Sequence, residues 1–321
     1  MNRLRLPAAA LALAMLLAAC GGGSSREPDA YPSEPIRLIV PYTAGGPTDI
    51  AARSLARYME GSLGQPVVVE NAPGASGSTA YQQLISSDPD GYTLSMTALP
   101  TAVLNYLVND VGYTRANFAP VGVATQVPSA LVVPANSPYP DLAALFAAAR
   151  SDPARITVGT PGATNTHAAE TRQITQLYGV PLTVLPFNGN QEVLTALLGG
   201  NSVAGFVNAS QDMLPAIESG QLRVLAVGTE KPLTYLDAPT FVEQGFPELT
   251  HSTTTFGVIA PAGTPQPVIT RLEETMRAAA TDAETVRGYD ERYVPGQFIG
   301  SAGLAALFAE TEQTFQGVAG G

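Results

Sequence analysis

Short apolar runs and longer amphipathic segments alternate along most of the chain. The run at 36–40 predicts a buried strand, and apolar residues recur at helical spacing from Ile50 to Met59. Further strands are predicted at 67–70, 92–96, 131–133, 155–159, 182–185, 223–227 and 256–260. Further helices are predicted after Asp141, at 191–198, after Pro265 and from Leu304 to Phe315. This alternation predicts an α/β fold in which crossover helices connect mostly parallel strands.

The length of the chain favours two sheets over one. About 300 residues follow the first 20 positions, which is enough for two packed cores of ordinary domain size. We place two crossings of the chain between lobes in the proline- and glycine-rich stretches near 124–130 and 228–256. This predicts a first lobe made of residues 31–127 and 245–321, with a second lobe, residues 128–244, inserted into it.

The N-terminal segment has the pattern of an export signal. Two arginines precede an apolar run at 6–19, which is shorter than the roughly 20 residues of a membrane-spanning helix. The quartet Leu-Ala-Ala-Cys at 17–20 looks like a bacterial lipobox, although an ordinary signal peptide with an incidental cysteine is the alternative. We therefore predict a lipoprotein signal peptide over 1–20, lipidation of Cys20, and a flexible linker over 21–30. The protein is then extracytoplasmic and held on a membrane by its lipid.

The charge of the chain limits its partners. Two of the 16 basic residues and none of the 27 acidic ones lie in the predicted signal peptide, so the remainder has a formal charge of −13. Nucleic acid is excluded as a partner because phosphate binding needs clustered Lys and Arg. Electrostatic docking on anionic lipid is disfavoured for the same reason. An anionic ligand would have to be held by local donors against an unfavourable overall field.

Three loops follow predicted strands, at the end of a sheet where α/β proteins bind ligands. The loop at 41–49 has two glycines before a helix N-terminus, and is either an oxyanion site or only a tight turn with a helix cap. The loop at 159–167 offers three threonine hydroxyls and an asparagine amide. It is either a carboxylate site without formal positive charge or a solvated loop. Phe187, in the loop at 187–192, is either a pocket wall or a core residue.

Signals of catalysis are sparse. The chain has two histidines, His167 and His251, and its single cysteine belongs to the lipobox. A phosphate-binding loop, a dinucleotide fingerprint and Cys/His metal-ligand spacing are all absent from the sequence. A lone histidine at a helix start is more typical of a structural residue than of a base. We therefore expect no catalytic residues, no metal and no cofactor, and keep an extracytoplasmic hydrolase as the alternative.

Several short stretches, in this order, resemble the extracytoplasmic receptors of tripartite tricarboxylate transporters, also called Bug proteins. The resemblance runs from about Tyr31 to Phe315. It is carried by the opening at 31–41 with Gly45-Gly46 and Asp49, by 64–71 with Pro73-Gly74-Ala75, by Pro89-Asp90-Gly91-Tyr92-Thr93-Leu94, by His167 after the Gly-Thr loop, by Leu197-Leu198-Gly199-Gly200 and by 260–265. Each stretch is weak by itself, and their combination is specific.

The resemblance implies a two-lobed, type II periplasmic-binding-protein-like α/β fold. Two mostly parallel sheets, flanked by helices, would close on a ligand cleft like a hinge. It also implies that a monomer captures a small organic anion or other carboxylate-bearing ligand and delivers it to the membrane permease subunits of the transporter. By position, the ligand-binding residues would be Tyr42, Thr43, Gly45, Asp49, Thr97, Ala98, Ala163, Thr164, Asn165, Thr166, His167, Phe187, Asn190 and Asn208.

The chain departs from the pattern of this family at a few loop positions. Asn188 stands where many relatives have a basic residue, Glu192 stands at a frequent proline, and Thr43-Ala44 replaces a frequent proline pair. These differences predict a ligand that is smaller or less charged than citrate. Two other roles fit the same fold: a sensor subunit that presents ligand to a histidine kinase, and a structural envelope lipoprotein with a vestigial cleft.

Overall fold

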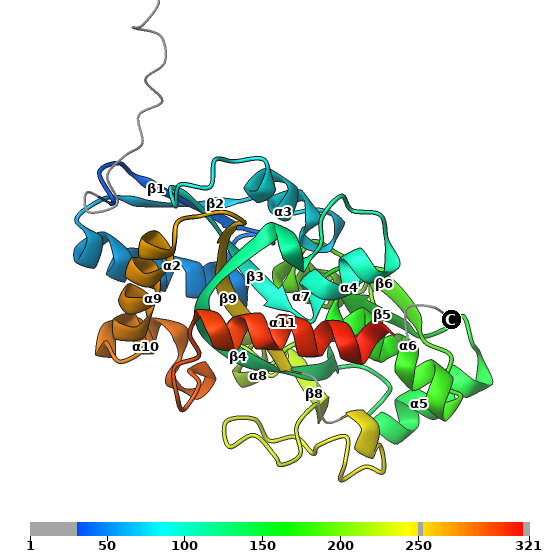
Figure 1. Ribbon diagram of the computed structural model, residues 1–321. Helices are drawn as coiled ribbons and strands as arrows, with labels where there is room; N and C mark the ends of the chain where they lie inside the picture. Colours follow the sequence, from blue (N-terminus) through cyan, green and yellow to red (C-terminus); the bar gives the residue numbers. More distant parts are fainter. Residues whose placement is uncertain (1–30, 250–252, 317–321) are drawn as a thin grey trace, which may run out of the picture. The chain divides into compact units, whose positions relative to one another are not determined.

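The computed structural model describes residues 31–249 and 253–316 (Figure 1). The elements given below belong to one compact unit, which begins at Pro32. The predicted signal peptide, the lipidation site Cys20 and the predicted linker lie outside the described residues. In the described part of the chain, no helix is long and apolar enough to cross a membrane.

Nine strands of the described part form one sheet. They are β1 (Ile36–Val40), β2 (Val67–Asn71), β3 (Thr93–Leu99), β4 (Phe118–Pro134), β5 (Thr157–Thr160), β6 (Thr183–Pro186), β7 (Ala204–Asn208), β8 (Leu222–Val227) and β9 (Thr253–Pro261). Their order is β2-β1-β3-β9-β4-β7-β5-β6, and β8 also pairs with β4. All seven strands predicted after the first are found, although β4 is much longer than its predicted core, and β7 was not predicted.

The long strand β4 joins the two halves of this sheet. Its first part, 118–128, pairs with β9, and its last part, from Ser129 on, pairs with β7 and β8. The change of partners after Pro128 falls within the stretch where the first lobe crossing is predicted. The exact lobe boundaries, 127/128 and 244/245, stay predictions, and this change of partners favours the first of them.

The directions of the strands correct one expectation. We expected two mostly parallel sheets, but the sheet is continuous and mixed. The pairs β1–β2, β1–β3, β5–β6 and β5–β7 are parallel, whereas β3–β9, β4–β9, β4–β7 and β4–β8 are antiparallel. The physical reason lies in β4, which passes from one half to the other as a single strand, and in β9, which lies between β3 and the first part of β4. Antiparallel neighbours need no crossover helix, so β9 can pair along its whole length with residues 118–128 of β4.

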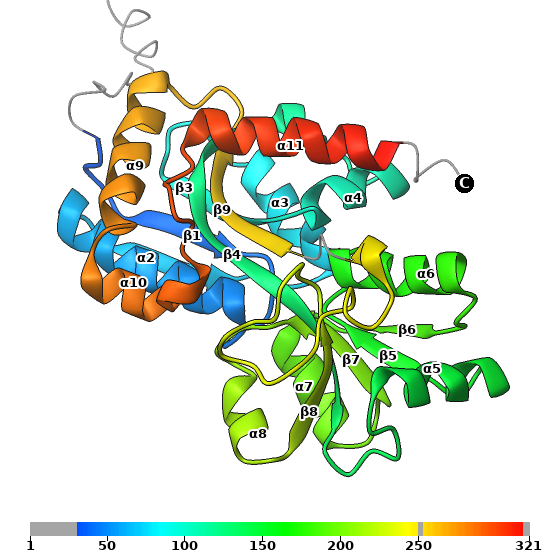
Figure 2. The ribbon, with the colours of Figure 1, turned by 90° about the horizontal axis from the view of Figure 1, so that it is seen from below.

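Helices cover both faces of the sheet (Figure 2). They are α2 (Pro47–Leu63), α3 (Ser78–Ile85), α4 (Thr101–Val108), α5 (Leu142–Ser151), α6 (Thr166–Tyr178), α7 (Asn190–Leu198), α8 (Leu214–Glu218), α9 (Gln266–Ala279), α10 (Ala283–Tyr289) and α11 (Ser301–Gln316). Helix α2 contacts both α9 and α10, while α11 contacts α4. The Asp141 carboxylate accepts a 2.8 Å hydrogen bond from the Ala144 N–H and caps α5, as predicted.

Each half of the sheet has its own apolar core. In the half built on β4 to β8, Phe146, Phe206 and Phe241 are fully buried in one cluster. In the other half, Tyr81 and Phe118 pack with their ring centroids 5.7 Å apart. Apolar burial of this kind stabilises each half by about 25 cal/mol per Å². The polar loops between strand ends and helix starts are therefore held by rigid supports.

Candidate functional site

A small pocket lies where strand ends meet helix starts. Its free volume is about 20 Å³, which is room for about one water molecule. It is lined by Tyr42, Gly46, Pro47, Thr48, Ala98, Thr101, Pro161, Asn165, His167, Asn190, Asn208, Thr254 and Phe256. These residues come from both halves of the sheet, so the pocket needs both halves to exist.

Four helices begin at this pocket. Thr48 lies in the first turn of α2, Thr101 begins α4, Asn165 caps α6, and Asn190 begins α7. The first N–H groups of a helix have no partner within the helix, and they form the positive end of its dipole. Four such ends around one small space favour an anion there.

None of the described residues that line the pocket carries a formal charge. The single titratable base among them is His167, which is 2% exposed, and its burial lowers its pKa to about 3. The imidazole is therefore neutral at physiological pH. A negatively charged group in this pocket would be held by neutral donors and helix dipoles alone.

The protonation of the His167 ring follows from its neighbour Asn165. The Oδ1 atom of Asn165 accepts a 2.8 Å hydrogen bond from the Ala168 N–H, which directs its Nδ2 atom to the ring Nδ1 atom, 3.5 Å away. An amide nitrogen can only donate, so this contact favours Nδ1 as the acceptor and the tautomer with the proton of the neutral ring on Nε2. The Nε2 atom is buried and has no partner in the described part of the protein. Its N–H is a donor left for the pocket.

Two more polar side chains at the pocket are buried without a partner in the described residues. They are Asn208, whose Oδ1 atom is unpaired and which is 5% exposed, and Thr254, whose hydroxyl is unpaired and which is 3% exposed. A buried polar atom without a hydrogen bond costs about 1–3 kcal/mol, so such groups are rare in folded proteins. Three of them around one space indicate a binding site.

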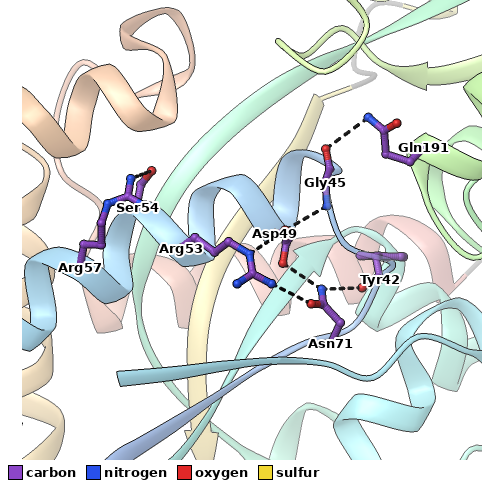
Figure 3. A network of polar contacts seen from close by, with 8 residues as sticks. All are labelled: Tyr42, Gly45, Asp49, Arg53, Ser54, Arg57, Asn71 and Gln191. Carbon is purple, nitrogen blue, oxygen red and sulfur yellow. Dashed lines mark hydrogen bonds and ion pairs between the residues drawn. The ribbon is translucent and has the colours of Figure 1, made fainter. Parts of the chain in front are cut away.

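Loops from the two halves meet on one side of the pocket. The Thr43 N–H donates to the Asn188 carbonyl over 3.2 Å. The Gln191 side-chain amide donates to the Gly45 carbonyl over 3.3 Å, as Figure 3 shows. These bonds join the β1–α2 loop to the β6–α7 loop.

A second set of bonds joins the halves through the β5–α6 loop. The Thr164 N–H donates to the Ser76 hydroxyl over 3.2 Å, and the Thr166 N–H donates to the Thr101 hydroxyl over 3.4 Å. The Thr164 hydroxyl also donates to the Asn105 side chain. A molecule larger than water can enter the pocket only if contacts of this kind separate.

Asp49, a predicted ligand residue, is instead fully engaged in shaping the first loop. Its carboxylate accepts 2.9 Å hydrogen bonds from the Gly45 N–H, the Arg53 guanidinium and the Asn71 amide (Figure 3). Burial by itself raises the pKa of Asp49, but these three bonds outweigh it and hold the pKa below its usual range. Asn71 also donates to the Tyr42 carbonyl over 3.0 Å. Asp49 therefore supports the loop that carries Tyr42 without lining the pocket.

The sequence matches the family described as "Tripartite tricarboxylate transporter family receptor" over residues 51–295. The chain belongs to this family. It is 36% identical over 258 residues to the UPF0065 protein in the gbd 5′ region of Cupriavidus necator, covering 78% of this chain and 76% of that one. It is 33% identical over 297 residues to protein BugT of Bordetella pertussis, covering 90% of this chain and 88% of that one.

Solved structures of similar proteins have the same fold. MatC from Rhodopseudomonas palustris with bound malate is 26% identical and superposes with a TM-score of 0.84, covering 90% of this chain and 100% of that one. An R. palustris protein with adipate is 30% identical with a TM-score of 0.82, covering 90% and 97%. Periplasmic binding protein BugD is 27% identical with a TM-score of 0.81, covering 90% and 99%. The predicted family and the periplasmic-binding-protein-like α/β fold are both confirmed, and the protein is a solute receptor of this family.

The structure gathers some of the predicted site residues at the receptor pocket and leaves others beside it. Those that line the pocket are Tyr42, Ala98, Asn165, His167, Asn190 and Asn208. Thr43 and Phe187 line a neighbouring surface groove together with Gln191. Thr97 is fully buried in β3, and the Ala163 carbonyl accepts a 2.8 Å hydrogen bond from Arg172. Their roles as ligand contacts stay predictions.

Sequence reasoning missed several lining residues of the receptor pocket. Thr101 begins a helix that was not predicted, and Thr254 and Phe256 lie on β9. A signal for β9 was present, because three consecutive threonines precede the predicted strand at 256–260. The pattern predicts a buried strand, yet buried hydroxyls need hydrogen-bond partners. These threonines could therefore have identified the strand as a wall of a pocket.

Proposed function

We propose that this receptor captures a small carboxylate-bearing metabolite in the pocket around His167, delivers it to the membrane permease subunits of a tripartite tricarboxylate transporter, and performs no chemistry on it. The observation that carries this proposal is the combination of four helix N-termini with buried, unpaired neutral side chains. A carboxylate would accept hydrogen bonds from both kinds of donor and would relieve the unpaired His167 Nε2–H.

The described lining residues also favour a ligand of low charge. Without Lys or Arg at the pocket, each carboxylate must be stabilised by dipoles, and the chain has a net charge of −11 that opposes every additional anion. Similar proteins have been solved with malate and with adipate, both of which carry two carboxylates. We therefore favour a mono- or dicarboxylate over citrate.

Anchoring through Cys20 is a separate part of the proposal. A receptor tethered by lipid through a flexible linker stays near its permease, which raises the effective concentration for delivery. Metabolic labelling with a palmitate analogue in a bacterial host tests this point. We expect a labelled band that is lost on Cys20→Ser, and an unlabelled wild-type band would contradict the anchor.

Thermal unfolding tests the proposed capture. The purified full-length chain, kept in detergent, is melted with mono-, di- and tricarboxylates and with the matching amides. Specific binding at 100 times Kd stabilises the folded state by about 2.7 kcal/mol, which gives a clear rise in Tm. We expect the rise with one class of mono- or dicarboxylate but not with its amides. A rise with citrate alone would contradict the preference for low charge, and no rise with any acid would contradict carboxylate capture.

A further inference from the structure

Four consecutive residues after β2 have positive φ angles. The angles are +133° at Gly74, +46° at Ala75, +52° at Ser76 and +94° at Gly77. Glycine adopts such a backbone without steric cost, whereas the Cβ atoms of Ala75 and Ser76 are crowded by the following carbonyl oxygen. Among the other described residues, only Asp290 has a side chain on a backbone of this kind. The turn at 74–77 is therefore a point of concentrated backbone strain, and such strain persists where the surrounding structure uses the conformation.

Ser76 contacts the opposite half of the sheet through its side chain. Its hydroxyl accepts a 3.2 Å hydrogen bond from the Thr164 N–H, and its carbonyl accepts a 2.8 Å bond from the Asn105 side-chain amide. The Thr164 hydroxyl donates to the Asn105 Oδ1 atom, which closes a ring of hydrogen bonds. Ser76 and Asn105 belong to the half that contains β1, and Thr164 follows β5 in the other half. We call the three residues Ser76, Asn105 and Thr164 the clasp.

The close approach of the β5–α6 loop to the clasp requires a glycine. A Cβ atom added to Gly162 would lie 2.6 Å from the Ser76 Oγ atom and 3.3 Å from the Ser76 Cα atom. The Gly162 carbonyl accepts a 2.8 Å hydrogen bond from the Thr160 hydroxyl at the end of β5, which fixes the loop within its own half. The turn and the loop therefore meet at backbone distance, with no side chain of Gly162 between them.

The clasp is connected to the pocket through the chain itself. Thr164 directly precedes Asn165, which caps α6 by accepting from the Ala168 N–H and whose amide nitrogen lies 3.5 Å from the Nδ1 atom of His167. The position of Thr164 therefore limits where Asn165 and His167 can lie. Ser76 itself is not among the residues that line the pocket, so it would act on a ligand only through Thr164.

We propose that Ser76 is a positioning residue for ligand capture, which holds the β5–α6 loop across the two halves and thereby places Asn165 and His167 at the pocket. This inference rests on the proposed function and adds to it a residue that does not touch the ligand. The strained turn lowers the stability of the fold, and it persists because it presents Ser76 to Thr164. Separation of the two halves breaks this bond, so Ser76 contributes only while the loops are in contact.

Ser76→Gly tests the inference because it removes the hydroxyl and relieves the strain at the same time. A residue with a structural role alone would change Tm and affinity in the same direction. We expect the Tm of Ser76→Gly to equal or exceed that of the wild type, since glycine accepts this backbone. We expect its affinity to fall about 3–10-fold, the effect of one lost hydrogen bond. Calorimetry on the full-length chain uses lactate, succinate, malate and adipate, and the acid that the wild type binds most tightly is carried to each variant.

Ala75→Gly is the matched control for this substitution. Ala75 is exposed, has the same backbone conformation as Ser76 and lies outside the clasp. Its replacement by glycine relieves strain and adds flexibility at the neighbouring position without removing a hydrogen bond. We expect a Tm at or above the wild-type value and an affinity within about twofold of the wild type.

Hydrogen exchange tests the clasp without any ligand. In Ser76→Gly the Thr164 N–H has lost its acceptor, so this amide should exchange at least about threefold faster than in the wild type. Ala75→Gly should leave the exchange rate unchanged. Mass spectrometry of the peptide over residues 161–168 measures the rate in all three proteins.

Three results would overturn the inference. Wild-type affinity and wild-type exchange in Ser76→Gly would show that the loop is held without Ser76. Equal weakening of binding by the two glycine variants would assign the effect to flexibility of the turn and not to the clasp. If the wild type binds none of the four acids, the proposed function fails and the role of Ser76 in capture fails with it, while the exchange rate still shows whether Ser76 holds the loop.

Discussion

Two polar clusters lie close together in this receptor and differ in one respect. Both oxygens of the Asp49 carboxylate are paired, with Gly45, Arg53 and Asn71 all donating to them. Around His167 three buried polar atoms of the pocket have no partner among the described residues, namely the His167 Nε2 atom, the Asn208 Oδ1 atom and the Thr254 hydroxyl. Both clusters follow a strand and begin a helix, so position in the fold does not separate them. The two clusters differ in whether their hydrogen-bonding groups have partners. The paired cluster around Asp49 supports the fold, and the unpaired cluster around His167 is available to a ligand.

The largest expected effect is on stability, from the paired cluster. Asp49→Ala removes the acceptor of three hydrogen bonds and leaves the partly buried Asn71 amide with fewer partners. We expect a loss of about 2–4 kcal/mol in the free energy of unfolding, measured by urea titration. Glu60→Ala, at an exposed position on the same helix, should change it by less than about 0.5 kcal/mol. Equal effects of the two substitutions would contradict a structural role for Asp49.

A substitution in the unpaired cluster should lower ligand affinity without lowering stability. His167→Leu removes a buried donor that has no partner and keeps an apolar side chain of similar size in its place. We expect unchanged or higher stability, but an affinity for the bound carboxylate that is lower by about 10–100-fold, measured by calorimetry. Gln176→Leu, at an exposed position on the same helix, is the control for affinity. A His167→Leu protein that binds as tightly as the wild type would remove His167 from the site.

The low pKa of His167 predicts a pH dependence of stability. Burial lowers this pKa from 6.5 to about 3, so between these values the unfolded chain binds more protons than the folded one. Stability due to this group is therefore present above pH 6.5 and is lost as the pH falls toward 3, by up to about 1.4 kcal/mol per pH unit.

The comparison with His167→Leu isolates this effect from other titrating groups. Asp212, near the pocket, has a pKa that burial raises to about 6, and it acts in the opposite direction over part of the same range. Because both proteins contain Asp212, the difference between their urea-unfolding free energies reports His167. We expect the wild type to lose stability relative to the variant on acidification from pH 6.5, and parallel curves would contradict a neutral, buried ring.

The smallest expected effect concerns the contact between the two halves. Gln191→Ala removes the hydrogen bond to the Gly45 carbonyl, together with a 3.3 Å bond to Asp212. Loss of one partly exposed bond is worth at most about 1 kcal/mol, so we expect ligand to dissociate up to about fivefold faster. Stopped-flow displacement measures this rate, with Asn201→Ala as the control. Slower dissociation from Gln191→Ala would show that this contact does not hold the receptor closed.

Most of the fold could be predicted because its signals are local. Apolar runs marked the strands, and Asp141 and Pro265 marked helix starts where the structure has them. The mixed directions of β4 and β9 could not be predicted in this way. Strand direction is decided by pairing between residues far apart in the sequence, and a short apolar run has the same appearance in either direction.

Part of the lining of the candidate site could be predicted for the same reason, because its signals are local. His167 and Asn165 occur together in one loop, so their chemistry was visible in the sequence. Asp49 has the same local appearance as a ligand-binding residue, and only the structure shows that Arg53 and Asn71 occupy its carboxylate. Whether a polar side chain is already paired depends on distant segments, which one sequence does not reveal.

Nitrogen NMR of isotope-labelled histidine tests the central claim most directly. The chain has two histidines, so the His251→Gln variant shows the ring of His167 alone. We predict a neutral ring with its proton on Nε2 from neutral pH down to about pH 5, and a shift of the Nε2 signal when the acid that most raises Tm is added. Titration of the ring near pH 6.5 would contradict a neutral, buried His167. An Nε2 chemical shift that does not change when the acid binds would contradict a ligand contact at this nitrogen.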